Sequence, residues 1–200
     1  MQFYLIYLNI FITSLVIVVG IYKLSALNLA LRVLLSLLSI SLICDVSLLV
    51  MNINDLHNLW LINIYALLEG AFLLLVYFFM LPISKIRKFI PLIAFFYISI
   101  GIVEWIFWIE NDKLLSLTLI IEALLMLVFS LNAFYILLQK LEYHKIQQNP
   151  VFWFNVGILL YFAGALIVFI FSNYILKLPE IGLWMIHNVL HFFYFCSFDH

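Results

Sequence analysis

The sequence predicts an all-α membrane protein, a polytopic bundle of seven transmembrane helices with its N-terminus outside and its C-terminus in the cytoplasm. Three observations support this fold class. The 200 residues are 68% hydrophobic and 10% charged, and their mean hydropathy of +1.25 lies far outside the composition of soluble domains. Seven apolar stretches reach the roughly 20 residues that a helix needs to cross a bilayer. Basic residues concentrate on alternate connections between these stretches.

The seven spans are predicted at residues 2–22, 26–51, 59–81, 90–109, 114–138, 151–171 and 181–198. Lys23 ends the first span, and the polar segment 52–58 ends the second. Segment 82–89 contains a proline and three basic residues, and segment 110–113 contains two acids and a lysine. Segments 139–150 and 172–180 precede the last two spans. Every connection is short, so neighbouring helices should be antiparallel and residues 1–200 should form one transmembrane domain.

The distribution of basic residues sets the predicted orientation. One side holds six of them, Lys23, Lys85, Arg87, Lys88, Lys140 and Lys145, and the other side holds Lys113 and Lys177. Cytoplasmic loops carry the excess of Lys and Arg, so the six should face the cytoplasm of a cell whose plasma (inner) membrane holds this multi-pass protein. The first span lacks a basic leader and a small-residue cleavage site, so we expect it to stay attached. The net charge of -1, without a long cationic run, excludes nucleic acid as a partner.

Ionisable residues gather at one depth of the predicted bundle. Counted at 1.5 Å per residue, six of them lie roughly 9 to 16 Å below the outer boundary: Asp45, Glu69, Glu104, Glu122, His187 and His191. No Lys or Arg reaches this layer, because Arg32 belongs to the cytoplasmic end. A charged side chain at mid-membrane costs about 2.5 to 3.5 kcal/mol, so the four acids cannot all be charged, unpaired and exposed to lipid.

Four arrangements remain for these acids: protonation, pairing with histidine, a bound cation, or a water-filled pocket open to the outside. The sequence therefore predicts a ligand or ion pocket in the outer half of the bundle, lined by Asp45, Glu69, Glu104, Glu122 and His187. Glu69 and Glu122 are expected to face each other or a shared cavity. The alternative is that these groups make interhelical hydrogen bonds that only hold the bundle together.

A metal site is a further alternative. His187 and His191 stand four residues apart, so both imidazoles could hold one zinc ion if carboxylates complete its shell. This pair is similar to the His-x-x-x-His on the last span of seven-helix zinc amidases of the alkaline ceramidase type, which implies lipid hydrolysis. The third histidine of that family is missing from every span here, since His57 and His144 lie in connections. We therefore expect no cofactor and keep zinc as the alternative.

Five segments carry a second resemblance. They are residues 63–69 (NIYALLE), 120–122 (IIE), 149–164 (NPVFWFNVGILLYFAG), 171–174 (FSNY) and 183–187 (LWMIH). Together they resemble an uncharacterised family of small bacterial seven-helix integral membrane proteins, which is itself similar to the membrane sensor regions of some histidine kinases. The resemblance implies input sensing, with Glu69, Glu122 and His187 as the polar positions, whereas an amide is more usual at the position of His191.

The sequence thus favours a sensor or accessory module in which a small ligand, cation or proton occupies the outer pocket and shifts helix packing. We expect no output domain after the last span, so either signalling requires a separate protein on the cytoplasmic side, besides the lipid bilayer itself, or the chain is a sensor without its effector. A proton or small-cation transporter is the alternative, and its path would need polar groups in the inner half, where Arg32, Asn132 and Asn155 lie. A zinc-dependent hydrolase and a scaffold without a ligand site remain as further alternatives.

Overall fold

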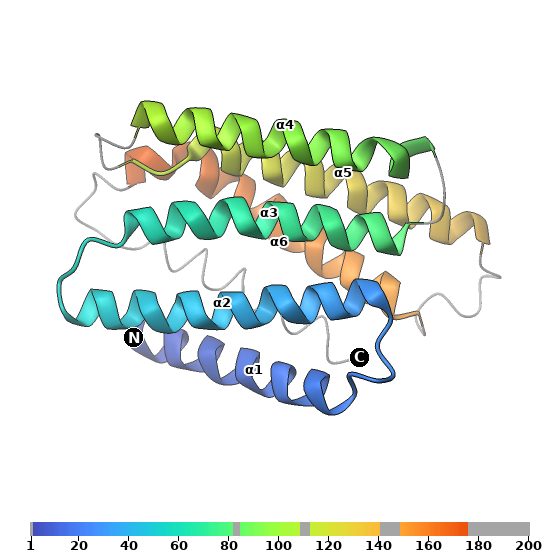
Figure 1. Cartoon of the computed structure of the whole chain (residues 1–200), viewed down its shortest axis with the longest axis horizontal. Coiled ribbons are helices and arrows are strands. Elements are labelled where there is room, and N and C mark those ends of the chain that lie inside the picture. Colours follow the sequence, from blue (N-terminus) through green and yellow to red (C-terminus); the bar gives the residue numbers. More distant parts are fainter. Residues whose placement is uncertain (1, 82–84, 109–112, 141–148, 176–200) are drawn as a thin grey trace. The chain divides into compact units, whose positions relative to one another are not determined.

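Six α-helices make up the part of the chain that the computed structural model describes, residues 2–81, 85–108, 113–140 and 149–175. They are α1 (Gln2–Tyr22), α2 (Leu29–Ile53), α3 (Leu59–Met80), α4 (Lys85–Trp108), α5 (Ser116–Lys140) and α6 (Pro150–Ile175) (Figure 1). Helices α2 to α6 are long and apolar enough to cross a membrane, and the apolar stretch Tyr7–Tyr22 of α1 is shorter. The predicted all-α class is therefore confirmed, with helices apolar enough to span a membrane. The seventh predicted span, 181–198, lies outside the described residues.

The chain divides into two compact units. The N-terminal unit comprises residues 6–118 and therefore holds most of α1, all of α2, α3 and α4, and the first turn of α5. The C-terminal unit comprises residues 119–200 together with residues 1–5. Each unit has its own internal packing. The single transmembrane domain and the orientation stay predictions.

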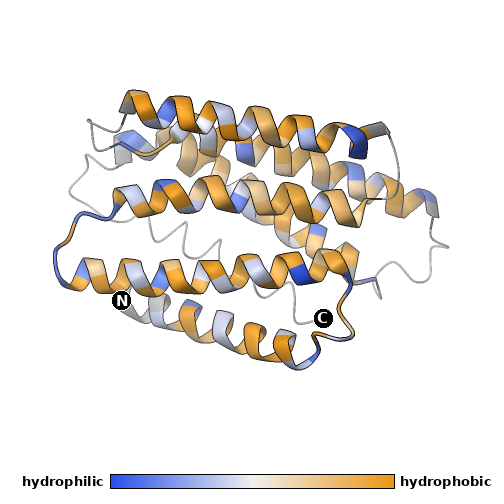
Figure 2. Cartoon of the chain, viewed as in Figure 1, coloured by the Kyte–Doolittle hydropathy of each residue, from blue (hydrophilic) through white to orange (hydrophobic). Residues whose placement is uncertain are grey.

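Consecutive helices of the N-terminal unit run antiparallel, as the short connections predict. The end of α2, the start of α3 and the end of α4 lie at the same end of the unit, the left-hand end in Figure 1. In the predicted orientation this is the outer end, and it is called the outer end below. Hydrophobic residues cover most of the helices, whereas the connection between α2 and α3 is hydrophilic (Figure 2).

Local hydrogen bonding explains where α2 begins and ends. The Asn28 side chain accepts a hydrogen bond from the Leu31 amide (2.9 Å), so α2 begins at Leu29, three residues after the predicted start at Ala26. At the other end, Asp55 adopts a left-handed φ of 51°. Its amide donates to the Asn52 carbonyl (3.3 Å) and the next amide, of Leu56, donates to the Met51 carbonyl (2.9 Å). These two bonds form a Schellman motif, which satisfies carbonyls that the helix end would otherwise leave free.

Proline shapes the junction of α3 and α4. Leu81 is extended (φ -74°, ψ 140°), as expected for a residue before proline, and α3 therefore ends at Met80. Helix α4 begins at Lys85, five residues before the predicted start at Ile90, and continues through Pro91. The Arg87 guanidinium lies 4.7 Å from the centroid of the Phe78 ring, a cation–π contact that ties the start of α4 to the end of α3. The basic cluster expected in a connection thus belongs to the first turns of α4.

Helices α5 and α6 pack together within the C-terminal unit. The Ser130 hydroxyl donates to the Asn155 carbonyl (2.9 Å), and Phe134 meets Phe152 edge to face with ring centroids 5.6 Å apart. Met126 on α5 and Ile158 on α6 are fully buried. A hydroxyl bonded across the interface and interlocked apolar side chains are typical of helices packed in a membrane.

Candidate functional site

Two carboxyl groups lie at nearly the same depth of the neighbouring helices α2 and α3. Asp45 lies eight residues before the last residue of α2, and Glu69 lies ten residues after the first residue of α3. At 1.5 Å per residue the two groups are about 12 and 15 Å from the outer end, so they lie at nearly the same depth in neighbouring antiparallel helices. Both side chains are half-buried, and they are close enough for their charges to interact. The structure thus brings together two of the residues predicted to line the pocket.

The surroundings of this carboxyl pair contain no compensating charge among the described residues. Neither Asp45 nor Glu69 forms an ion pair or a side-chain hydrogen bond within residues 2–81, 85–108, 113–140 and 149–175. Arg32, the basic residue on α2, lies 13 residues (45 − 32) or about 20 Å from Asp45 along the helix. Its Nε donates instead to the Leu27 carbonyl (3.0 Å). Two interacting carboxyls that lack a cationic partner in the described part of the chain are suited to hold a shared proton or a small cation.

Glu104 has a different environment, at the start of α5. One of its carboxylate oxygens accepts a hydrogen bond from the Leu117 amide (2.9 Å). The other accepts from the Thr118 amide (2.8 Å) and from the Thr118 hydroxyl (2.6 Å). Glu104 is 7% exposed, and it lies four residues, about 6 Å, before the end of α4. A side chain of one helix therefore caps the first turn of the next, where amides lack partners and the helix dipole favours negative charge.

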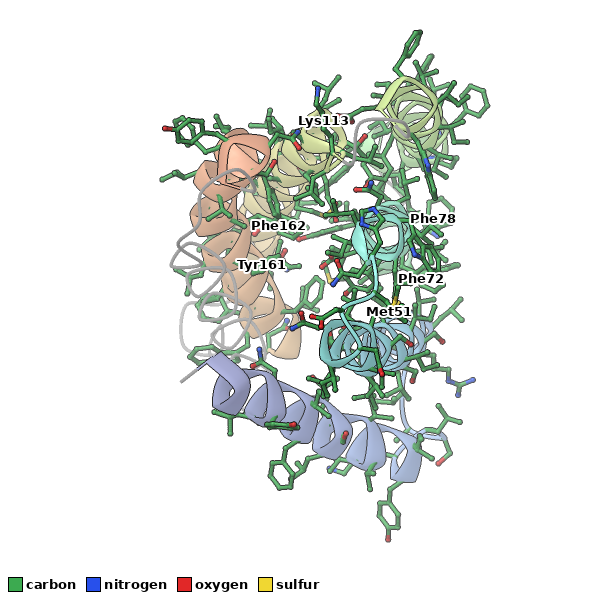
Figure 3. All side chains as sticks on the ribbon, turned by 90° about the vertical axis from the view of Figure 1, so that its left-hand side faces the viewer. Met51, Phe72, Phe78, Lys113, Tyr161 and Phe162 are labelled. Carbon is green, nitrogen blue, oxygen red and sulfur yellow. The ribbon has the colours of Figure 1, made fainter. Side chains whose placement is uncertain are left out.

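Asn63 fixes the segment that leads into α5. Its amide nitrogen donates to the Lys113 carbonyl (3.0 Å), and its amide oxygen accepts from the Leu115 backbone amide (3.2 Å). Leu114 and Leu115 are 1% and 0% exposed, although α5 starts only at Ser116. This buried, non-helical stretch needs a polar partner for its backbone, and Asn63 supplies it. Figure 3 looks onto this outer end, with Lys113 just before α5 and Met51 near the end of α2.

Close packing between α3 and α4 completes this region. The Tyr97 hydroxyl donates to the Ala66 carbonyl (2.9 Å), and Tyr97 is 2% exposed. A Cβ at Gly70 would overlap the Tyr97 hydroxyl oxygen, and a Cβ at Gly101 would overlap Leu67 Cδ2. Only glycine fits at either position without displacing the facing side chain. Small residues at these points bring the two helices close enough for the hydrogen bonds at the outer end.

Three predicted site residues remain, Glu122, His187 and His191. Glu122 is on α5 in the C-terminal unit and is 1% exposed, so its predicted proximity to Glu69 stays a prediction. His187 and His191 lie outside the described residues, as does the zinc site that they were predicted to supply. Within the described parts of the chain, no group of three or more His, Cys, Asp and Glu residues is placed to hold a metal ion.

Comparisons with protein-family models, with curated proteins and with solved structures find no match. The site therefore has to be interpreted from its own geometry. The predicted layer of acids contains two distinct environments in the N-terminal unit: the Asp45–Glu69 pair, and Glu104 at the outer end with its three hydrogen bonds. Sequence reasoning did not identify Asn63 as a site residue. The available signal was an amide side chain four residues after the start of a helix that is mostly apolar.

Proposed function

We propose that this chain is a multi-pass plasma-membrane sensor or accessory module whose input site is the Asp45–Glu69 pair in the outer half of the bundle. The observation that carries the proposal is that these two carboxyls lie at nearly the same depth of two neighbouring antiparallel helices, where their charges interact. Within the described residues, no basic side chain pairs with either of them. Two negative charges close together in a medium of low dielectric repel strongly. A proton or a small cation removes that repulsion and so favours closer packing of α2 against α3.

The change in packing would be read on the cytoplasmic side by a separate signalling protein. A ligand shifts a conformational equilibrium only by its different affinity for the two states. The pair supplies such a difference, because a bound proton or cation stabilises the state in which the carboxyls are close and has little effect on a state in which they are apart.

The direct test measures the thermal stability of the purified protein in detergent from pH 5 to pH 9. We expect the melting temperature of the wild type to fall as pH rises, because repulsion within the pair then increases, and to recover when Na⁺ or Mg²⁺ is added at constant ionic strength. Asp45→Asn and Glu69→Gln should each flatten both responses, since an amide keeps the size of the side chain without its charge.

Ser47→Ala is the matched control on the same helix, because the Ser47 hydroxyl bonds to the Ile43 carbonyl of α2 (2.7 Å) and takes no part in the pair. It should retain the wild-type profile. Identical pH and cation profiles in the wild type, both carboxyl variants and the control would refute the proposal, because the carboxyls would then be packing residues.

Proton or small-cation transport is the second candidate function. Polar groups on α5 and α6 favour it: Asn155 and Ser130 are fully buried, and the buried Asn132 side-chain nitrogen has no hydrogen-bond partner among the described residues. Asn132 lies 16 residues (132 − 116), about 24 Å, along α5 and therefore in the predicted inner half. Transport predicts proton or Na⁺ flux into liposomes that contain the purified protein, and this flux should disappear in Glu69→Gln. A sensor predicts no flux.

A further inference from the structure

We infer that α5 is the output helix of the proposed sensor and that hydrogen bonds at the outer end pass movement of α3 to it. The inference rests on the proposed function and concerns how occupancy of the Asp45–Glu69 pair is transmitted. The transmitting group, called the clamp below, consists of Asn63, Glu104 and Thr118.

Helix α3 has two separate polar faces, one toward the pair and one toward the clamp. Asn63, Ala66 and Gly70 lie on one side of α3, where Asn63 holds the chain before α5 and the other two contact Tyr97 of α4. Glu69 lies roughly 90° around the helix from this side, at 3.6 residues per turn, and its carboxyl interacts with the Asp45 charge on α2. A shift or rotation of α3 that closes the carboxyl pair must therefore also move Asn63.

The clamp joins this face of α3 to the first turn of α5 through short bonds. Asn63 bonds to the backbone on both sides of Leu114, and Glu104 accepts three hydrogen bonds from Leu117 and Thr118. A Cβ at Gly101 would lie 3.3 Å from Thr118 Cγ2, so α4 also contacts this turn closely. Charge-assisted hydrogen bonds to buried amides are short and strong, so the turn has little freedom to stay in place when α3 and α4 move.

Helix α5 carries the movement onward. It is continuous from Ser116 to Lys140, about 37 Å at 1.5 Å per residue, which is enough to reach from the outer to the inner boundary. A packed helix moves as a rigid element rather than deforming, so a tilt imposed on the first turn displaces the far end. Without such transmission the clamp would be only a static joint that holds three helices together.

The experiment places spin labels at Leu75→Cys on α3 and Leu138→Cys on α5, both exposed positions, with Cys44 and Cys196 replaced by serine. Distances are measured at pH 5.5 and pH 8 in the full-length protein, and melting temperatures are recorded at the same two pH values. We expect the label distance to change with pH in this background. The change should fall to less than half in Thr118→Val, which keeps the shape of the side chain but loses the 2.6 Å bond, and in Asn63→Ala.

Three further variants separate transmission from folding and from the input site. Thr118→Ser keeps the hydroxyl and should restore the change in distance. Ser99→Ala should leave it unaltered, because the exposed Ser99 bonds to the Phe95 carbonyl of its own helix (2.8 Å). Glu69→Gln should abolish both the change in distance and the pH dependence of melting. Thr118→Val and Asn63→Ala should keep that pH dependence, because the carboxyl pair is intact.

A full change in label distance in folded Thr118→Val and Asn63→Ala would overturn the inference and leave the proposed sensing function intact. The absence of any change in the parent background, while melting still depends on pH, would do the same. Loss of the pH dependence of melting in the parent itself would instead refute the proposed function.

Discussion

Replacing Glu104 with glutamine tests the joint between α4 and α5 directly. The substitution keeps the size of the side chain but removes its charge and turns one acceptor oxygen into a donor nitrogen. All three groups that face the carboxylate are donors, two amides and the Thr118 hydroxyl. Glutamine can therefore keep at most the bonds made to one oxygen. The variant loses one or two hydrogen bonds to a charged acceptor, worth about 1.5 to 3 kcal/mol each. Because such losses are not additive, we expect a destabilisation of about 2 to 4 kcal/mol.

The assay is reversible unfolding of the purified protein in mixed micelles, followed by circular dichroism at constant pH. Ser99→Ala is the reference, since an exposed serine bonded within its own helix should change the free energy of unfolding by no more than about 0.5 kcal/mol. Hydrogen exchange adds a local readout: the Leu117 and Thr118 amides should exchange faster in the glutamine variant. Equal stability of Glu104→Gln and Ser99→Ala, with unchanged exchange at these amides, would show that the capping argument is wrong.

Three further predictions concern the packing and the turns. Gly70→Ala should destabilise the protein by about 1 to 3 kcal/mol, because the new Cβ would overlap the Tyr97 hydroxyl oxygen. In unfolding measurements the same glycine substitution should cost clearly less in a Tyr97→Leu background, and strict additivity of the two substitutions would contradict the contact. Asp55→Gly should raise the free energy of unfolding by about 1 kcal/mol, because glycine adopts the left-handed φ of 51° without a Cβ penalty, whereas a loss of stability would argue against the Schellman turn. Ser130→Ala should lower the free energy of unfolding by about 0.5 to 1.5 kcal/mol, because it removes the bond to the Asn155 carbonyl. The Phe134 ring lies one turn further along α5 and contacts Phe152 of α6, so a double variant with Phe134→Ala should show whether the two contacts are coupled.

Hydropathy and chain breaks were sufficient to predict the class of the fold and the approximate helix positions. The starts of the helices were less accurate, because they depend on single bonds and single backbone angles. Asn28 sets the start of α2 through its side-chain oxygen. Pro91 looked like a residue near the start of a span, yet α4 begins six residues before it at Lys85. A proline near the start of a helix interrupts only one internal hydrogen bond, which the sequence pattern does not reveal.

Residue counting predicts the position of each acid along its helix, but it does not predict the group that each acid interacts with. Counting residues predicts one depth for Asp45, Glu69 and Glu104, and Asp45 and Glu69 do lie at nearly equal distances along α2 and α3 from the outer end. Glu104 is different because it accepts hydrogen bonds from backbone amides. Almost every residue has a backbone amide, so the residue types at positions 117 and 118 do not predict these bonds. The same holds for Asn63, whose partners are the carbonyl of Lys113 and the amide of Leu115. Such bonds join a side chain to a backbone group that only helix packing brings close. The sequence alone therefore does not predict which backbone group the side chain will bond to.

The cap that Glu104 forms on α5 has a consequence for biosynthesis. During insertion α4 leaves the ribosome before α5, and at that moment the amides of Leu117 and Thr118 are not yet available to the Glu104 carboxylate. A charged side chain in lipid is costly, by about 2.5 to 3.5 kcal/mol at the centre of a helix and less toward its ends. The pairing favours release of α4 and α5 from the translocon together, as a helical hairpin in which the acid is already satisfied. The order in which the helices are synthesised therefore determines when the Glu104 carboxylate can cap α5.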